Sequence, residues 1–357
     1  MNTLANELNV KYFRLKGRLL YIGPINLGNL PKGGDQYRNQ LAVLNLQNIY
    51  NMRLIDTFNW KNKPFIKFSI LYYLFFNASY SKIIIAASTI SAIKILKIAD
   101  KLVKRKDKIV YWVIGGELDK ILPQNLDLIP SLNRLKGIVV QTNLMDKNLR
   151  EMGLLNTQKI SNYKEFKIGN LLHRQKQETI RPLKLVFLSR ICETKGVTVI
   201  FEALDHLTKE KCQVDFYGPI DQDYKEYFLN EIYSRENANY KGYLNLRDDF
   251  EESIDILSTY DLFLFPTFWK SEGHAGVLID AMCAGLGIIA TDWNSNHEFI
   301  TNNGRLITPR NAHSLVNALN LYLENPELIV EHANASLENV KDYHISNIFP
   351  QYLATLN

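Results

Sequence analysis

The residues that could do chemistry in this chain gather in one segment, 265–298, with the sequence FPTFWKSEGHAGVLIDAMCAGLGIIATDWNSNHE. A short apolar run, a small-residue turn and a helical pattern over 277–284 predict a buried parallel strand, a turn and a helix. Glu272 lies on the turn, and Asp280 lies eight residues later, about one turn into the helix. Both carboxylates can therefore border one pocket.

The turn beside these acids has the composition of an anion site. Gly273 and Gly276 let a ligand approach the backbone, and the free amides at the start of the helix carry partial positive charge. A phosphate fits such a place, and two acids beside it indicate recognition of hydroxyl groups, as on a sugar or a ribose. His274 can donate a proton or a hydrogen bond there, because imidazole titrates near neutral pH.

Two cations follow a predicted strand over 183–189. Arg190 and Lys195 would lie at the carboxyl edge of the sheet, where open α/β sheets bind their ligands. Taken alone, such a pair is as well explained by solvated charges in a loop. The Lys195-Gly196 helix start favours a binding role.

These segments resemble the retaining glycosyltransferases of the GT-B fold, family 4, of the bacterial surface-polysaccharide type. The family's donor motif is an acid, seven residues and a second acid, and Glu272 and Asp280 occupy the acidic positions. Three more segments match in the right order: PKGGDQYRNQ around Gly33 and Gly34, LVFLSRICETKGVTVIFEAL at 185–204, and VDFYG at 214–218. The resemblance implies two Rossmann-like parallel-sheet domains facing across a cleft.

The resemblance also implies the reaction. It is the transfer of a sugar, in the manner of a hexosyltransferase, from a UDP- or GDP-linked donor to an acceptor hydroxyl with retained configuration. Glu272 would contact donor-sugar hydroxyls near the reacting carbon, and Arg190 and Lys195 would stabilise the charge that builds on the leaving diphosphate. Asp280, one methylene shorter than the usual Glu, would hold the ribose. The remaining donor-binding residues would be Gly273, His274, Ala275, Gly276, Val277, Gly34 and Gly218.

The first half of the chain departs from the resembling family. Many relatives have a histidine there that faces the donor sugar, but this chain has none before His173. Gly115, Gly116 and Glu117 follow the predicted strand 109–113 in the corresponding region. We expect these three residues to line the acceptor side.

One acidic triplet has the spacing of a metal site. Asp221-Gln222-Asp223 resembles the motif with which glycosyltransferases of a different fold hold a divalent cation. The acids stand just before a helical pattern, where helix N-capping explains them. We therefore expect no metal and no cofactor, with the basic pair in place of the cation.

The length and composition predict an ordinary globular protein of two domains. The chain has 357 residues, 46% of them hydrophobic and 22% charged. We place the acceptor-side domain at 1–172, a linker (HRQKQETIRP) at 173–182 and the nucleotide-sugar domain at 183–339. By the resemblance, the last helix, 340–357, crosses back to the first domain.

Short apolar runs alternate with helical patterns throughout, as expected for two parallel α/β units. Predicted strands of the first unit are 18–22, 52–57, 82–86, 109–113 and 137–141, and a helix over 37–46 follows Gly33 and Gly34. Those of the second unit are 183–189, 213–217, 261–265 and 286–291. This pattern is the independent basis for the α/β fold class.

The cysteines and the apolar segments indicate in which cellular compartment the protein is expected. Cys192, Cys212 and Cys283 lack metal-ligand spacing and indicate a reducing compartment, so we expect a cytoplasmic protein. No signal sequence is evident, and the longest apolar stretch, 65–78, is too short to cross a bilayer.

A basic helical face raises the question of a membrane surface. Lys94, Lys97, Lys101 and Lys104 recur at intervals of three and four. The face is either merely solvated or attracted to anionic lipid, an alternative favoured by the net charge of +5 and the segment PFIKFSILYYLFF. The aromatic and basic interleaving of a nucleic-acid module is absent.

Two other functions remain open at this stage. A sugar-nucleotide epimerase can share the architecture and would convert the donor without an acceptor. A non-catalytic polysaccharide-assembly protein is the other, although Glu272, Arg190 and Lys195 would then have no physical reason to occur together. An oxidoreductase is disfavoured, because GPINLGNLPKGG at 23–34 lacks the glycine spacing of a dinucleotide turn.

Overall fold

The computed structural model describes residues 16–30, 33–174, 182–246 and 249–357. Contacts divide the chain into two units. The first is Met1–Ile114, Asp127–Val139 and Thr355–Asn357, and the second is Gly115–Leu126 and Val140–Ala354. Most of the predicted linker, residues 175–181, lies outside the described residues, and the domain boundaries at 172 and 183 stay predictions.

The first sheet has six strands in the order β2-β1-β3-β4-β5-β6. Its inner strands are almost wholly apolar and buried, as in a parallel sheet covered on both faces. Their bounds are β1 Arg18–Gly23, β2 Asn51–Asp56, β3 Lys82–Ser88, β4 Ile109–Ile114, β5 Gly137–Val140 and β6 Thr157–Lys159. The helices that accompany this sheet in sequence are α1 Gly34–Leu46, α2 Pro64–Phe75, α3 Thr89–Leu102, α4 Leu118–Ile121, α5 Ile129–Leu132 and α6 Asn143–Glu151.

Polar side chains hold the loop after β1. The Tyr21 hydroxyl donates to Asn39 Oδ1 at 2.8 Å, and Asn39 Nδ2 donates to the Pro24 carbonyl at 3.0 Å. The Asp56 carboxylate accepts from the backbone N–H groups of Ile25 and Leu27, each at 2.9 Å. Burial opposes ionisation of Asp56, yet these and further backbone donors together lower its pKa.

The second sheet also has six strands, in the order β12-β11-β10-β7-β8-β9. The strand order reverses between β7 and β10, which is the arrangement of a dinucleotide-binding fold. Strand bounds are β7 Leu183–Leu188, β8 Cys212–Tyr217, β9 Ala238–Gly242, β10 Leu262–Phe265, β11 Gly287–Thr291 and β12 Gly304–Ile307. Helix bounds are α7 Val197–Leu204, α8 Lys225–Tyr233, α9 Phe250–Leu257, α10 Gly276–Cys283, α11 Ala312–Glu324, α12 Glu327–Asn339 and α13 Ile345–Ala354.

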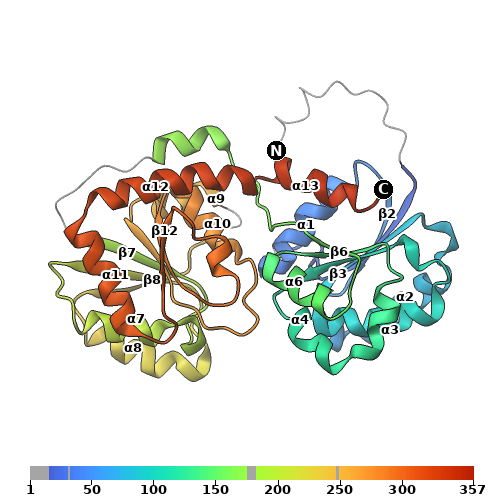
Figure 1. The fold of residues 1–357 in the computed structure, drawn as a ribbon, viewed down its shortest axis with the longest axis horizontal. Coiled ribbons are helices and arrows are strands. Elements are labelled where there is room, and N and C mark those ends of the chain that lie inside the picture. The colour runs from blue at the N-terminus through green and yellow to red at the C-terminus, as the bar shows by residue number, and fades with distance from the viewer. Residues whose placement is uncertain (1–15, 31–32, 175–181, 247–248) are drawn as a thin grey trace. The chain divides into compact units, whose positions relative to one another are not determined.

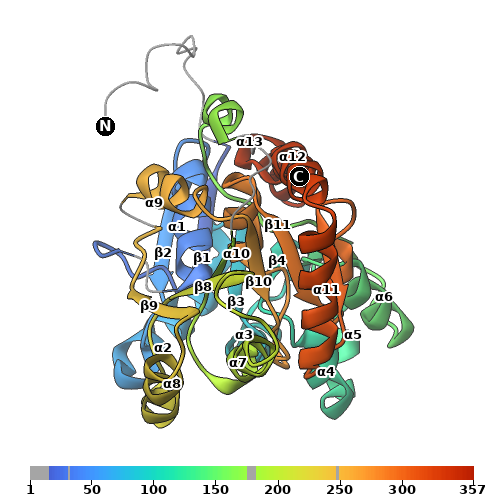
Figure 2. The ribbon, with the colours of Figure 1, turned by 90° about the vertical axis from the view of Figure 1, so that its left-hand side faces the viewer.

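Two apolar clusters cover the two faces of the second sheet. Phe263 and Phe265 of β10 point into one cluster together with residues of α9 and α10, while Leu262 and Leu264 point into the other with residues of α7 and α11. This alternation follows from the two-residue period of a strand. Figures 1 and 2 show α12 on one side of β7 and β8 and α7 and α8 on the other.

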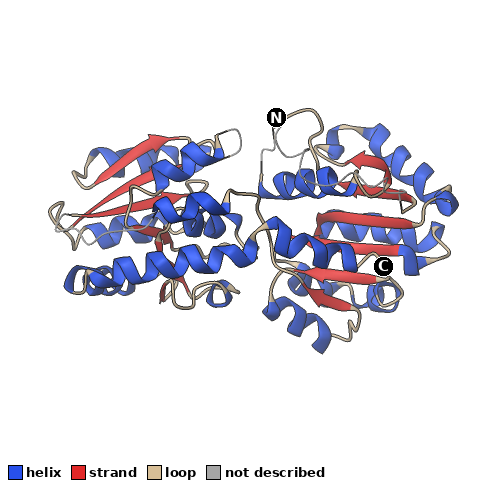
Figure 3. Ribbon diagram, turned by 90° about the horizontal axis from the view of Figure 1, so that it is seen from above, coloured by secondary structure: helices blue, strands red, loops and turns tan. Residues whose placement is uncertain are grey.

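The fold prediction is confirmed, since the chain forms two six-stranded parallel α/β sheets (Figure 3). All nine predicted strands are present, with small shifts at their ends. The missed strands β6, β9 and β12 are edge strands with polar, partly exposed residues, so they give no continuous apolar run. Helix α1 begins three residues before its predicted start at 37, and α10 begins one residue before 277.

Cys192, Cys212 and Cys283 are free and buried, as expected of small apolar residues. Burial raises the pKa of the Cys212 thiol to about 12 and raises that of Cys283 well above its ordinary value. Within the described residues, no helix is both long enough and apolar enough to cross a membrane.

Candidate active site at the switch point of the second sheet

The predicted site residues come from two loops that the sheet itself brings together. Strands β7 and β10 are hydrogen-bonded neighbours, with Leu264 opposite Phe187, so their carboxyl ends lie side by side. Arg190 and Lys195 follow β7, and Glu272 follows β10. The strand order reverses at this pair of strands, and open α/β sheets bind their ligands at such a point.

Gly196 allows the two loops to approach each other closely. It follows the short helix Glu193–Lys195 and has φ of +78°, a left-handed conformation that favours glycine. A Cβ at this position would overlap the carbonyl oxygen of Pro266. The missing side chain therefore sets Lys195 directly beside the loop that follows β10.

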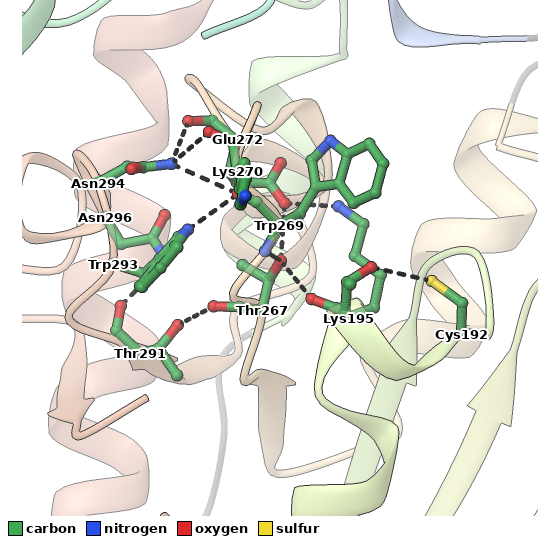
Figure 4. A network of polar contacts seen from close by, with 11 residues as sticks. Cys192, Lys195, Thr267, Trp269, Lys270, Glu272, Thr291, Trp293, Asn294 and Asn296 are labelled. Atoms are coloured by element: carbon green, nitrogen blue, oxygen red, sulfur yellow. Dashed lines mark hydrogen bonds and ion pairs between the residues drawn. The ribbon is translucent and has the colours of Figure 1, made fainter. Parts of the chain in front are cut away.

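Glu272 and Lys195 form a buried ion pair (Figure 4). Lys195 Nζ lies 2.5 Å from Glu272 Oε2, and the side chains are only 13% and 9% exposed. The Thr267 hydroxyl donates to the same oxygen at 2.9 Å. The two predicted catalytic residues thus meet, and a hydroxyl that the sequence did not single out joins them.

The loop after β11 holds the backbone of this turn. Trp293 Nε1 donates to the Trp269 carbonyl at 2.9 Å, and Asn294 Nδ2 donates to the Glu272 carbonyl at 3.0 Å. The Thr291 hydroxyl donates to the carbonyl of Thr267. Figure 4 shows these side chains reaching the turn, and the contacts fix the backbone that carries Glu272.

Arg190, on the same loop after β7, makes different contacts from Lys195. Its guanidinium stands 5.2 Å from the centre of the Trp269 ring and 3.6 Å from an Asp221 oxygen. Asp221 occupies the N-cap position of the short helix Gln222–Tyr224, as predicted, but its side chain makes no capping hydrogen bond there. Asp221 instead balances the charge of Arg190.

The second acid of the motif has its own lysine. Asp280 is almost fully buried in α10, and its carboxylate forms an ion pair with Lys164 Nζ. A Cβ at Gly276 would lie 3.4 Å from Lys164 Cε, so this lysine borders the first residue of α10. Lys164 occurs in an irregular stretch, and the sequence offered no signal for it.

His274 is enclosed by aromatic rings. It stacks on Phe299 at 3.7 Å between centroids and lies edge-on to Tyr343 at 5.0 Å. Its Nδ1 accepts from the backbone N–H of Asn162 at 3.2 Å, so this nitrogen carries no proton. These contacts give His274 a packing role, and its contact with a donor stays a prediction.

The predicted acceptor-side residues lie against the turn that carries Glu272, within the second unit. Gly116 donates its N–H to the Ser271 carbonyl at 3.2 Å, and the Glu117 carboxylate accepts from the Ser271 hydroxyl. Gly115, with φ of +84°, precedes them. A Cβ at Gly116 would lie 2.6 Å from the Glu272 carbonyl oxygen, so only glycine fits this close approach.

A second lysine that the sequence analysis missed is Lys120 of α4. Its ammonium donates to the Lys270 carbonyl and to Asn294 Oδ1. Burial lowers its pKa, while Asp119, Glu117 and Glu272 act in the opposite direction. A small pocket here is lined by Gly116, Asp119, Lys120, Thr142, Leu144, Met145, Glu272, Gly273, Asn294 and Ser295.

The two remaining predicted glycines differ. Gly218, with φ of +134°, follows β8 at a place where a Cβ would overlap the Ser189 carbonyl oxygen, so it is required by the packing beside Arg190. Gly34 is the first residue of α1, and a Cβ there would meet nothing within 4 Å. Among the described residues, no group of three or more His, Cys, Asp or Glu side chains could hold a metal ion.

The second unit contains the part of the chain that is similar to a known protein family. Residues 171–341 match the family model of Glycosyl transferases group 1. This part of the chain is therefore similar to the group 1 glycosyltransferase domains. Arg190, Lys195, Glu272 and Asp280 all lie inside it, whereas Gly116, Lys120 and Lys164 lie outside the matched residues. No curated protein sequence matches the chain significantly.

Solved structures match over nearly the whole chain and share its GT-B fold. HepE (Alr3699) of Anabaena, in complex with UDP, is 17% identical, with a TM-score of 0.74 over 95% of this chain and 99% of that one. Sucrose-phosphate synthase of Thermosynechococcus elongatus is 13% identical, with a TM-score of 0.74 over 94% and 97%. The lipopolysaccharide outer core galactosyltransferase WaaB is 15% identical, with a TM-score of 0.70 over 95% and 99%.

Proposed function

We propose that this protein is a retaining glycosyltransferase that moves a sugar from a nucleoside diphosphate to an acceptor hydroxyl. The observation that carries the proposal is the ion pair between Lys195 and Glu272, at the switch point of a domain that is similar to the group 1 glycosyltransferases. A buried lysine beside a carboxylate suits a donor that has both a negative diphosphate and a hydroxylated sugar. Structures of HepE contain UDP and UDP-glucose, which supports a UDP-sugar as the first donor to test, with GDP-sugars next.

The leaving group is the part of the donor that needs positive charge. Lys195, Arg190 and the backbone amides at the start of α10 supply it, without a divalent cation or a cofactor. When the bond between the sugar C1 and the phosphate oxygen breaks, charge grows on the diphosphate. Cations and amides already in place stabilise that charge with little reorganisation.

Retention follows from attack on the face that the leaving group vacates. The acceptor oxygen forms the new bond to C1, and its proton passes to the departing phosphate. The products are a glycoside and a nucleoside diphosphate, so no enzyme carboxylate needs to bond to the sugar. Glu272 contacts the sugar hydroxyls, and Thr267 and Lys195 orient its carboxylate.

Asp280 and Lys164 serve the nucleoside end of the donor. Their contact places a carboxylate and an ammonium beside Gly276, the first residue of α10. Asp280 would accept from a ribose hydroxyl, and Lys164 would hold that short carboxylate in place. Gly34, Gly218 and the turn from Gly273 to Val277 complete the donor-binding set, with Gly115, Gly116 and Glu117 on the acceptor side.

The acceptor is a glycan or a lipid-linked intermediate of surface polysaccharide synthesis, used at the cytoplasmic face of a membrane. The support is a basic surface: Lys94, Lys97 and Lys101 of α3 are exposed, and so is Lys104, two residues after this helix ends. A free glycan would have no use for such a face, whereas a lipid carrier places its acceptor beside anionic headgroups.

The test begins with a panel of UDP- and GDP-sugars. For each one, the increase in the melting temperature of the protein is measured, because a ligand that binds the folded state raises it. With the best donor, Glu272→Gln should lower transfer by ~10²–10³-fold, because the carboxylate that faces the sugar is lost. The matched control is Glu236→Gln, since Glu236 forms a 2.5 Å ion pair with Lys209 at an exposed place. Transfer by Glu272→Gln at the rate of this control would remove Glu272 from the mechanism.

Two further readouts test the details. EDTA should leave transfer unchanged, and loss of activity that Mg²⁺ restores would contradict the metal-free proposal. NMR of the product should show the anomeric configuration of the donor. Conversion of the donor to an epimer without any acceptor would establish the epimerase instead.

A further inference from the structure

Helix α2 carries an unusual concentration of exposed apolar side chains. Phe65, Phe68 and Phe75 are 81%, 67% and 63% exposed, and Leu71, Tyr72 and Phe76 are exposed as well. Exposed apolar patches of this kind mark surfaces that bind something. Because all these residues belong to the first unit, the patch does not depend on the donor site.

The fold needs only one side of this helix. Ile70 and Leu74, four residues apart, are fully buried and attach α2 to the unit. Phe65, Phe68, Tyr72 and Phe75 recur at intervals of three and four along another side. A helix that is apolar all round is usually buried all round, so packing within the unit does not explain this second stripe.

Positive charge surrounds the aromatic stripe. Residues 57–99 contain six lysines and no aspartate or glutamate. Helix α3, which packs against α2, presents its exposed lysines beside it. The acids nearest in sequence are Asp56, whose carboxylate accepts from backbone amides, and Asp100, which pairs with Lys106 and Arg134.

Two hollows place these cations at both ends of the stripe. One, of about 360 Å³, is lined by Trp60, Lys61, Lys67, Ser88, Ile90, Ser91 and Lys94. The other, of about 800 Å³, is lined by Phe75, Asn77, Ala78, Ser79, Tyr80, Ser81, Lys101, Leu102, Lys104, Arg105 and Lys108. Each hollow is wide enough for a small anionic group beside an aromatic side chain.

We propose that α2 docks the protein on an anionic phospholipid bilayer. Its aromatic stripe enters the boundary between headgroups and acyl chains, and the exposed lysines of both hollows contact lipid phosphates. These are Lys61, Lys67, Lys94, Lys101 and Lys104. Aromatic rings favour that boundary, and basic amphipathic helices lie in its plane. A second copy of this chain fits less well, because a symmetric contact would set the two lysine clusters against each other. The inference deepens the proposed lipid-linked acceptor.

The test is flotation of the full-length protein with vesicles of phosphatidylcholine alone or mixed with phosphatidylglycerol in equal parts. The wild type should float with the mixed vesicles and be released by high salt, because salt screens the lysines. Phe65→Gln, Phe68→Gln and Phe75→Gln combined should lower the bound fraction at least tenfold. The control combines Leu155→Gln and Tyr233→Gln, two highly exposed apolar residues away from the patch, and should bind like the wild type.

A second set of variants tests the charge. Lys61→Gln, Lys67→Gln and Lys94→Gln combined should lower the preference for phosphatidylglycerol several-fold, while Lys209→Gln, Lys211→Gln and Lys225→Gln should not change it. The melting temperature should stay within about 2 °C in every variant, since exposed side chains contribute little to the free energy of unfolding. Equal flotation of the phenylalanine variant and the wild type would overturn the proposal.

Failure of this inference is distinguishable from failure of the proposed enzyme. The phenylalanine variant should transfer sugar to a water-soluble acceptor like the wild type, because the patch lies outside the donor site. Flotation without any transfer would reject the glycosyltransferase and keep the docking surface. Sedimentation could instead show that the wild type is a dimer and that the phenylalanine variant is a monomer. If neither protein floated with vesicles, this result would assign the stripe to a second copy of the chain and overturn the lipid proposal.

Discussion

The two acids of one motif lie in different surroundings. Glu272 is on a turn, and its lysine comes from the neighbouring loop after β7, so the pair joins the two loops of the switch point. Asp280 is inside a helix, and Lys164 reaches it from a segment outside the sheet. The same chemical pairing thus connects loop to loop in one place and helix to connecting segment in the other. We infer that the first pair acts on the reacting sugar and the second keeps the nucleoside end in position.

The strongest way to break this comparison is Lys195→Ala. It removes a cation from the diphosphate and leaves a buried carboxylate without its lysine, so kcat/KM should fall by about 10²-fold or more, mostly in kcat. The free energy of unfolding should also fall, by ~3 kcal/mol, because one partner of a buried pair is lost. Steady-state kinetics and urea unfolding measure the two effects.

The control for Lys195→Ala is Lys209→Ala, which removes the lysine of an exposed pair. Exposed pairs contribute little, so the free energy of unfolding should hardly change. A Lys195→Ala enzyme with normal kcat but lower stability would show that the loop-to-loop pair is structural.

Lys164→Met should separate the two pairs by kinetic signature. Without the ammonium, Asp280 would be oriented less firmly, so the donor KM should rise about tenfold, the equivalent of ~1.4 kcal/mol, while kcat changes little. Loss of a ground-state contact has this signature. Initial rates over a range of donor concentrations, with Lys167→Met as the control, provide the measurement. An equal fall in kcat and kcat/KM would place Lys164 with the reacting sugar.

Asn294→Ala sharpens the first half of the comparison. It removes the hydrogen bond to the Glu272 carbonyl, so the turn should lose definition and kcat should fall about tenfold, since small displacements of a catalytic group are costly. Asn302→Ala, a surface asparagine, is the control. Unchanged kcat would mean that the sheet alone holds the turn.

The smallest expected effect is that of Trp269→Leu. Arg190 would lose its aromatic partner, a contact worth ~0.5–1 kcal/mol at an exposed site, so the donor KM should rise about two- to fivefold. Titration with the nucleoside diphosphate alone should show the same loss. An unchanged dissociation constant would exclude Arg190 from diphosphate binding.

The sequence predicted the acids and the cations better than their partners. Apolar runs located the central strands, and each strand end identified a loop, so Glu272 and Lys195 could be named separately. Their contact depends on the order of strands in the sheet, which no local pattern encodes. Lys164 and Lys120 approach the turn from distant segments with no distinctive composition. Asn294, in contrast, lies three residues after the predicted strand 286–291, so the rule that identified Arg190 could have found it.

Gly196 has one more consequence, for anyone who wishes to alter the residues around this site. Where two main chains touch without an intervening methyl group, the spacing between the loops is set by peptide geometry and not by the choice of neighbouring side chains. Substitutions around the pocket can therefore be screened for new sugar preferences while the lysine and the glutamate keep their separation. A library that also randomised position 196 would lose the fixed spacing between the two loops.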